Sequence, residues 1–136
     1  MREDAFESVW DNDINDVFAD VAPYYDRANA FATLGLGLID RLRDRHVSTA
    51  EVGPRQKALD LCAETTAIGI GLLKKQPDLE VYADDRSGAM QEVGRTRGQR
   101  RGFNIKFHTC DVHWLTFPDN HFDLLTLCVG VQPNFI

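Results

Sequence analysis

The feature that most constrains the fold is an alternation of short apolar segments with helical ones after residue 50. Strands are predicted at 57–62, 79–83, 103–110 and 122–131, and helices follow the first two, ending near 75 and 97. Strands that alternate with helices pair in parallel, because each helix returns the chain to the same end of the sheet. The sequence therefore predicts a doubly wound α/β fold with a mostly parallel sheet of about four strands.

The first 50 residues differ from the rest in charge and in pattern. Residues 1–26 carry eight acids and one base, so the net charge of −6 belongs to this arm while the rest is nearly neutral. Apolar side chains recur at near-helical spacing over 17–45, with Pro23 as an interruption. We predict an acidic N-terminal arm and helical segment at 1–50, and an α/β core at 51–136.

The composition argues against several classes of protein. No apolar run approaches the ~18 residues of a membrane span, and the acidic first residues differ from basic secretory and mitochondrial presequences. We therefore expect a cytoplasmic protein. The three cysteines, Cys62, Cys110 and Cys128, are widely spaced and odd in number, which favours reduced, buried thiols over a disulfide framework or a zinc ribbon.

Two local clusters have both a structural and a functional interpretation. The run RTRGQRR at 95–101 could contact phosphates, but an acidic pI of 5.1 favours a solvated helix end, and we expect no nucleic-acid partner. His108, Cys110 and His113, with His121 later in the chain, could ligate a metal ion, but no HxxxH or CxxC pair fixes a geometry. We expect no metal site.

Each of the first three predicted strands ends at or close to an acidic residue or a cysteine. These residues are Asp60 and Cys62, the pair Asp84-Asp85, and Cys110-Asp111. Ligands of open α/β sheets bind at the carboxyl ends of the strands, where a carboxylate can accept two hydrogen bonds from a ribose diol. The alternative is that these acids cap the helix after the second strand, together with Ser87. The pattern leaves both interpretations open.

Four blocks of sequence, in order, resemble a known family. They are VFADVAPYYDRAN (17–29), ALDLCAETTAI (58–68), VYADDRSGAMQEV (81–93) and CDVHWLTFPDNHFDLLTL (110–127). Together they resemble the ubiquinone/menaquinone C-methyltransferases of the UbiE type, which are class I S-adenosylmethionine-dependent methyltransferases. The resemblance implies a Rossmann-like methyltransferase fold, of which this chain carries the N-terminal part, and it implies S-adenosylmethionine as the cofactor.

The resemblance also implies roles for individual residues. Asp85 would accept hydrogen bonds from the ribose hydroxyls, Asp111 with the backbone of Val112 would meet the adenine edge, and Asp60 with the following loop would face the methionine part. Tyr25 would lie over the cofactor and help to order the site. The full assignment is Tyr25 as catalytic and Asp60, Cys62, Ala63, Asp85, Arg86, Asp111 and Val112 as cofactor-binding.

The first cofactor motif departs from the family pattern. Where the family reads L-D-x-x-G-G-T-G-D, this chain has Ala63, Glu64 and Thr66 in place of the three glycines. A Cβ in a left-handed backbone costs on the order of 1 kcal/mol, and the Glu64 carboxylate would repel the carboxylate of the cofactor. After the fourth strand, Gln132-Pro133 replaces an Arg-Asn pair, so no fixed positive charge faces the substrate. We expect poor cofactor affinity.

The fourth strand lies inside the seven-stranded sheet of the family, whereas this chain ends at Ile136, soon after it. An exposed apolar strand edge favours association, so we expect a second copy or a partner protein to cover it. The first hypothesis is a lapsed methyltransferase domain serving as an accessory or scaffold subunit, by analogy in a membrane-associated, quinone-linked complex. The alternative is an active C-methyltransferase of a quinol-like substrate, completed by self-association or by a partner chain.

Overall fold

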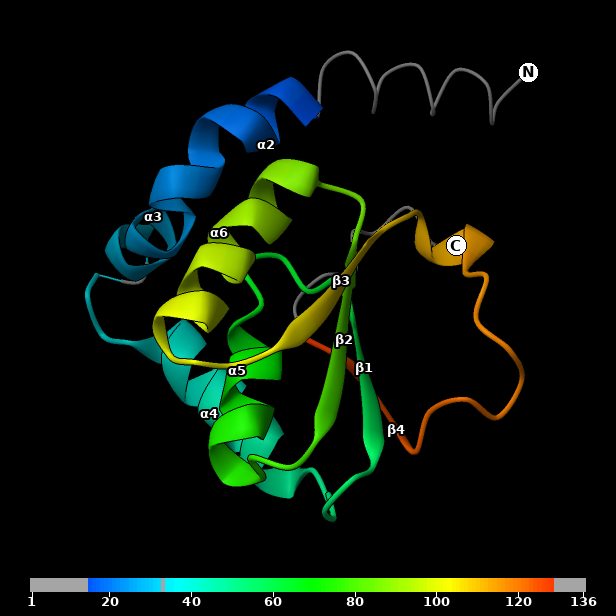
Figure 1. Ribbon diagram of the computed structural model, residues 1–136. Coiled ribbons are helices and arrows are strands. Elements are labelled where there is room, and N and C mark those ends of the chain that lie inside the picture. The colour runs from blue at the N-terminus through cyan, green and yellow to red at the C-terminus, as the bar shows by residue number, and fades with distance from the viewer. Residues whose placement is uncertain (1–14, 33, 129–136) are drawn as a thin grey trace.

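The computed structural model describes residues 15–32 and 34–128. Its sheet has four parallel strands in the order β3-β2-β1-β4, which is typical of βαβ units that wind outward from a first central strand (Figure 1). The strands are β1 (Lys57–Leu61), β2 (Glu80–Asp85), β3 (Ile105–Thr109) and β4 (Leu124–Leu127). The predicted parallel α/β sheet with an N-terminal helical arm is confirmed.

Three longer helices cover one face of the sheet, and shorter ones form the N-terminal arm (Figure 1). The covering helices are α4 (Leu38–Thr49), α5 (Ala67–Lys75) and α6 (Gly88–Arg100). The arm consists of α2 (Asn15–Val21), the 3-10 turn η2 (Ala22–Tyr24) and α3 (Tyr25–Ala32), and a further turn, η3 (Val112–Trp114), follows β3. No helix in the described ranges is both long and apolar enough to cross a membrane.

Two predicted boundaries were wrong. The second strand, predicted at 79–83 with Asp84-Asp85 directly at its end, includes both acids, because the neighbouring strand β3 continues the ladder to their positions and His108 pairs with Asp84. Gly98 lies inside α6 rather than in a loop, because its bare Cα packs against Ile105. The predicted end of the fourth strand and Gln132-Pro133 lie outside the described residues, as do residues 1–14 of the arm.

The hydrophobic core lies between the sheet and the covering helices. Alternate strand residues face it, and the small side chains of Ala58 and Ala83 allow α5 and α6 to approach the sheet closely. Leu72 from α5 is fully buried in this core, and Ala50 and Val47 extend it to α4. The helical segment therefore packs onto the α/β core, while the division at residue 50 stays a prediction.

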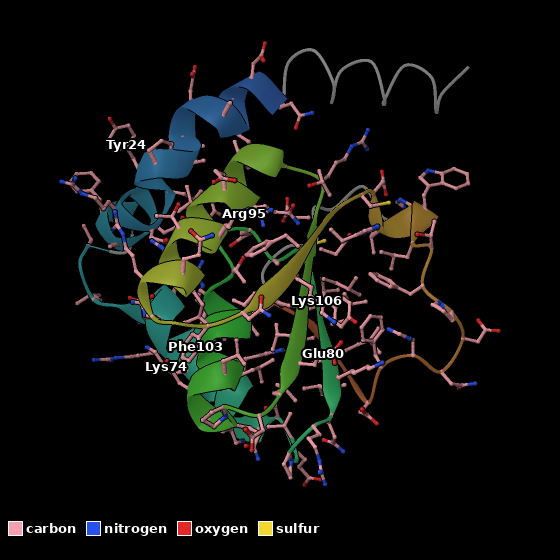
Figure 2. The ribbon with its side chains drawn as sticks, in the orientation of Figure 1. Tyr24, Lys74, Glu80, Arg95, Phe103 and Lys106 are labelled. Carbon is pink, nitrogen blue, oxygen red and sulfur yellow. The ribbon has the colours of Figure 1, made fainter. Side chains whose placement is uncertain are left out.

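The other face of the sheet, among the described residues, is covered by the loop between β3 and β4 rather than by helices (Figure 1). Tyr82 of β2 packs edge-on against Phe117, His121 and Phe122 of this loop, at ring-centroid distances of 5.1–5.8 Å. Glu80 and Lys106 pair across β2 and β3 (Figure 2). The loop does not cover β4 fully, since the side chains of Leu125 and Leu127 on this strand are 59% and 43% exposed.

Candidate functional site

Asp60, near the carboxyl end of β1, is buried under the turn that follows the strand. Its carboxylate accepts hydrogen bonds from the hydroxyl of Thr126 at 2.9 Å and from the backbone N–H of Gly69 at 3.1 Å. Burial raises the pKa of Asp60 to about 7. Asp60 therefore joins β1 to β4 and to the first turns of α5, and both its oxygens bind donors of the protein itself.

The turn from 62 to 66 keeps a left-handed backbone without glycine. Cys62, Glu64 and Thr66 have φ values of 50°, 50° and 62°. Glu64 and Thr66 stand at positions where the resemblance predicts glycine, and each side chain in this backbone conformation costs on the order of 1 kcal/mol. The hydroxyl of Thr66 is buried with no hydrogen-bond partner among the described residues, and it lies against Gly94 of α6. A glycine at 94 is required there, because a Cβ would collide with Thr66.

The Glu64 carboxylate is bound from the N-terminal arm. Its Oε1 accepts a hydrogen bond from the hydroxyl of Tyr25 at 2.7 Å, and its Oε2 accepts one from Arg43 at 3.2 Å. Its side chain is 18% exposed, and burial raises its pKa even though both partners favour the charged form. Burial and the contact with Glu64 raise the pKa of Tyr25 to about 12, so this phenol stays protonated at neutral pH.

Asp26 of α3 connects this group to two more helices. It pairs with Arg43 of α4 at 3.0 Å and with Arg97 of α6, and it accepts a hydrogen bond from the Thr65 hydroxyl at 3.1 Å. Arg43 is nearly buried, so its charge depends on Asp26 and Glu64 for compensation. The result is an ionic cluster that joins the arm to the turn after β1. We call Tyr25, Asp26, Arg43, Glu64 and Arg97 the arm cluster.

The acids at the ends of β2 and β3 also have protein donors. Asp85 accepts hydrogen bonds from the backbone N–H groups of Glu64 and Ser87, both at 2.7 Å. Ser87 caps α6, since its hydroxyl accepts from the N–H of Met90, so the helix-start interpretation accounts for Ser87 itself and for one oxygen of Asp85. Burial raises the pKa of Asp85.

Asp111, at the end of β3, is a second acid whose oxygens accept hydrogen bonds from donors of the chain itself. Arg86 pairs with one of its oxygens at 2.7 Å, and His113 contacts the other with both its backbone N–H and its ring. Val112 follows directly and opens the turn η3. Both candidate contacts for a nucleoside therefore already accept hydrogen bonds within the chain.

The structure brings most of the predicted site residues to one edge of the sheet. Ala63 donates its N–H to the carbonyl of Asp84, and its neighbour Glu64 reaches Asp85 with its backbone and Tyr25 with its side chain. The three cysteines are free and half-buried, which corrects the expectation of buried thiols. Burial and the surrounding carboxylates raise the pKa of Cys62 to about 11, which keeps it a thiol at neutral pH.

Sequence reasoning missed several polar residues at this edge. Arg43 gave no motif and Arg97 was noted only as part of the basic run at 95–101, although the partly buried acids at 26 and 64 require cations nearby. Gln91 of α6 donates to the carbonyls of Ala83 and His108, tying the ends of β2 and β3 together. No group of three or more potential metal ligands occurs in the ranges 15–32 and 34–128.

Comparison with known proteins gives a consistent result. The sequence model of the ubiE/COQ5 methyltransferase family matches residues 6–135. The chain is 32% identical over 119 residues to a demethylmenaquinone methyltransferase of Thermus thermophilus, covering 88% of this chain and 53% of that protein. It is 36% identical over 124 residues to a ubiquinone/menaquinone biosynthesis C-methyltransferase of Stenotrophomonas maltophilia, covering 88% and 47%. The chain thus spans about half the length of these relatives.

Solved structures share the fold. A putative S-adenosyl-L-methionine-dependent methyltransferase from Methanococcus maripaludis superimposes with a TM-score of 0.63 at 22% identity, over 80% of this chain and 49% of that one. The YcgJ protein from Bacillus subtilis gives a TM-score of 0.60 at 24% identity, over 67% and 38%. At these identities the match concerns the fold, which is Rossmann-like.

Proposed function

The chain belongs to the ubiE/COQ5 methyltransferase family, and from this premise we propose that it is a methyltransferase-like domain whose cofactor site has lapsed and which acts as an accessory or scaffold subunit. Catalysis by a class I methyltransferase depends on binding S-adenosylmethionine in one orientation at the carboxyl edge of the sheet. The proposal therefore depends on whether the residues of this edge can still hold that cofactor.

The observation that carries the proposal is the side chain of Glu64. It stands where the family has a glycine, and Tyr25 and Arg43 hold its carboxylate in the turn after β1. A cofactor carboxylate brought to this turn would meet a like charge, and the donors it needs are already engaged. As arranged, these residues do not fit the methionine part of the cofactor.

At the nucleoside end, the two acids are partly occupied by donors of the chain itself. The oxygens of Asp85 each accept a backbone N–H, and those of Asp111 are shared between Arg86 and His113. A carboxylate has about four acceptor sites, so a ribose or an adenine could still donate to these oxygens but would share them with donors of the chain. The mismatch with the cofactor therefore lies at Glu64. We therefore derive no methyl-transfer step for Tyr25, whose raised pKa also keeps it from acting as a base.

A scaffold role also requires a surface for a partner. β4 is the last strand of the sheet in the described part of the chain, and its Leu125 and Leu127 are exposed. We propose that a second copy or a partner protein covers this strand edge. Because the relatives are named for menaquinone and ubiquinone biosynthesis, the proposed setting is cytoplasmic, at the periphery of a membrane-bound, quinone-linked assembly.

Calorimetric titration with S-adenosylmethionine tests the lapsed site. We expect no saturable binding of micromolar affinity to the natural chain, and measurable binding to Glu64→Gly, which frees Tyr25 and Arg43 and relaxes the left-handed turn. Glu64→Gln keeps an acceptor for Tyr25 and removes only the charge, so it should restore less binding. The matched control is Glu51→Gly, an exposed acid before β1. Micromolar affinity in the natural chain would overturn the proposal.

The second candidate is an active S-adenosylmethionine-dependent C-methyltransferase of a quinol-like substrate, completed by self-association or by a partner chain. Two observations favour it: Asp85 remains at the end of β2, and the contacts that occupy the turn come from side chains, which can rotate. Methyl transfer to a demethylmenaquinol-type quinol, measured alone and with candidate partner chains, tests it. Transfer that is lost in Tyr25→Phe would support this candidate against the first.

A further inference from the structure

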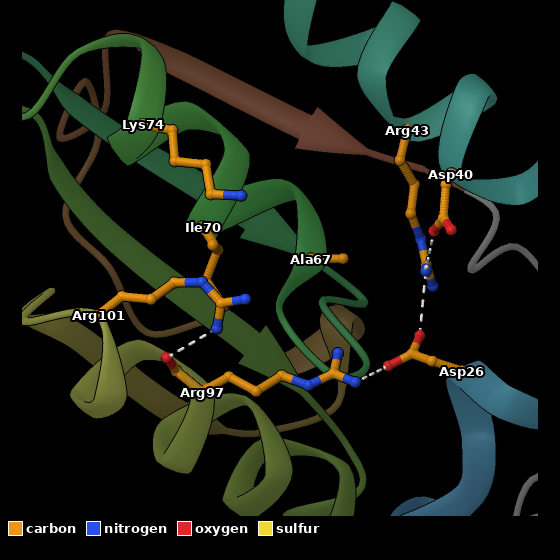
Figure 3. Close-up of a pocket in the computed structure, with 8 residues that line it drawn as sticks. All are labelled: Asp26, Asp40, Arg43, Ala67, Ile70, Lys74, Arg97 and Arg101. Carbon is orange, nitrogen blue, oxygen red and sulfur yellow. Dashed lines mark hydrogen bonds and ion pairs between the residues drawn. The ribbon is translucent and has the colours of Figure 1, made fainter. Parts of the chain in front are cut away.

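We propose that a cavity on the helical side of the molecule binds a small phosphoryl anion, of the inorganic phosphate or diphosphate class. The cavity lies between the arm and the covering helices, shares Asp26, Arg43 and Arg97 with the arm cluster, and has a volume of about 360 Å³ (Figure 3). Its lining consists of Asp26, Asp40, Arg43, Ala67, Ile70, Lys74, Arg97 and Arg101. Ligand pockets begin at roughly this size, so it suits a small ligand.

Helical spacing explains why cations gather there. On α5, Ala67, Ile70 and Lys74 are three and four residues apart, so they share one face of the helix. This face lines the cavity. Arg97 of α6 and Arg101, the residue that directly follows this helix, are four apart and line the cavity from the other side. Figure 3 shows the side chains of Lys74 and Arg101 extending toward the same region, and the apolar residues Ala67 and Ile70 also line the cavity.

The charges inside the cavity divide into a satisfied pair and an unsatisfied pair. Arg43 and Arg97 already compensate Asp26, and Arg43 also lies 3.7 Å from the exposed carboxylate of Asp40. Lys74 and Arg101, in contrast, pair with no acidic side chain of the described chain. Arg101 is nonetheless positioned, because one of its guanidinium nitrogens donates to the carbonyl of Arg97 at 3.2 Å. The cavity therefore offers two uncompensated cations, one of them fixed.

A phosphoryl anion matches this pair better than a carboxylate or a nucleic acid does. Its oxygens can accept hydrogen bonds from the planar guanidinium of Arg101 and from the ammonium of Lys74 at the same time. Because a phosphoryl anion can carry two negative charges, it can compensate both cations. A nucleic acid would need a continuous basic surface, but Arg95 of the same basic run turns away to pair with Glu92 and to cover the ring of Phe107. The ligand inferred is therefore a small free anion.

Calorimetric titration of the full chain with inorganic pyrophosphate and with inorganic phosphate, at low salt, tests the inference. The double variant Lys74→Ala/Arg101→Ala removes the unsatisfied pair. The matched control, Arg45→Ala/Arg100→Ala, removes the same formal charge from exposed positions outside the cavity. Both doubles should keep the far-ultraviolet circular dichroism of the natural chain, because all four side chains are exposed.

We expect the natural chain to bind pyrophosphate, the cavity variant to bind it at least about tenfold more weakly, and the control to stay within about twofold. Equal weakening in the two doubles would show general attraction to positive charge and would overturn the inference. So would the absence of binding up to about 10 mM anion, or preferential binding of a single-stranded oligonucleotide over pyrophosphate. The experiment contains no S-adenosylmethionine, so its outcome is independent of the proposed lapse of the cofactor site.

Discussion

The two faces of the sheet are covered in different ways. On the helical face, α5 and α6 exclude water completely from Ala58, Leu72 and Ala83. On the loop face, the loop between β3 and β4 packs aromatic rings on Tyr82 and leaves Leu125 of β4 59% exposed. The same four strands thus support a finished core on one side and a partly covered surface on the other.

The difference follows from where each cover comes from in the sequence. A βαβ unit supplies the helix that covers its own strands, so the helical face is completed by segments next to the strands it protects. The loop face depends on segments that do not directly follow β1 or β2, and within the described residues only the 110–123 loop reaches it. Consecutive βαβ units of this kind therefore cover one face of their sheet completely, while the cover of the other face depends on other segments.

A pair of leucine truncations tests this comparison with the largest expected effect. Leu72→Ala should lower the free energy of unfolding by about 3 kcal/mol, because it leaves a cavity in a fully closed core. Leu125→Ala should cost less than about 0.5 kcal/mol, since its side chain already contacts solvent. Urea unfolding measures both. Similar losses for the two variants would mean that the loop face is packed as well as the helical face.

The ionisation of Asp60 gives the next largest effect. Burial raises the pKa of Asp60 to about 7, so the folded chain keeps this proton at pH values where the unfolded chain has released it. Its contribution to the free energy of unfolding therefore falls as pH rises from about 4 to 7, by up to about 1.4 kcal/mol per pH unit, and is constant above that range.

Asp60→Asn isolates this contribution. The amide oxygen can accept from Gly69 and the amide nitrogen can donate to the hydroxyl of Thr126, so both native contacts have a counterpart. Urea unfolding at pH 5 and pH 8 should show a smaller loss of stability for Asp60→Asn than for the natural chain. An equal loss of stability between pH 5 and pH 8 in the two chains would show that Asp60 is ionised at both pH values. Its hydrogen bonds would then offset the cost of burying the charge.

The sequence was sufficient to predict the four strands, because each is a short apolar run bounded by turn residues. It ended the second strand just before Asp84 and Asp85, since acids are poor strand formers and only the neighbouring β3 shows why they stay in the ladder. It misplaced Gly98 for a related reason, because glycine favours a loop unless a neighbour such as Ile105 needs the space. Tertiary contacts decided these three positions.

The candidate site was predictable in part. The carboxyl ends of parallel strands meet at one edge, so residues such as Asp85 and Asp111 could be placed there from the pattern alone. The partners of Glu64 could not, because Tyr25 and Arg43 come from helices 39 and 21 residues earlier in the chain. Spacing within one element says nothing about contacts between elements this far apart.

The strained turn beneath α6 gives a smaller and more local test of the helical face. Thr66→Gly should raise the free energy of unfolding by about 1 kcal/mol, because it relieves a β-branched residue at φ 62° and removes a buried hydroxyl without a partner. Gly94→Ala should cost about 1–3 kcal/mol in the natural chain, since the new methyl collides with Thr66.

A double-mutant cycle connects these two changes. In the Thr66→Gly background the contacts with the Thr66 side chain disappear and only the 3.2 Å approach to the backbone of Thr65 remains, so Gly94→Ala should cost much less than in the natural chain. Gly88→Ala on the same helix is the control, because nothing lies within 4 Å of its new methyl. Additive effects of Thr66→Gly and Gly94→Ala would mean that α6 does not pack on the turn as closely as the helical face requires.

The smallest effect on stability is expected at β4, where the comparison concerns association rather than folding. Leu125→Lys should change the free energy of unfolding of the isolated chain by less than about 0.5 kcal/mol, because the long side chain can reach solvent from this exposed position. If a second copy covers the loop face beside β4, the same change should abolish self-association in sedimentation velocity, since it places a charge in an apolar interface. Leu38→Lys, at a leucine of α4 that is 50% exposed, is the matched control and should leave association intact. An equal loss of association in both variants would mean that association does not depend specifically on β4, and the incomplete cover of the loop face would then be a property of the monomer.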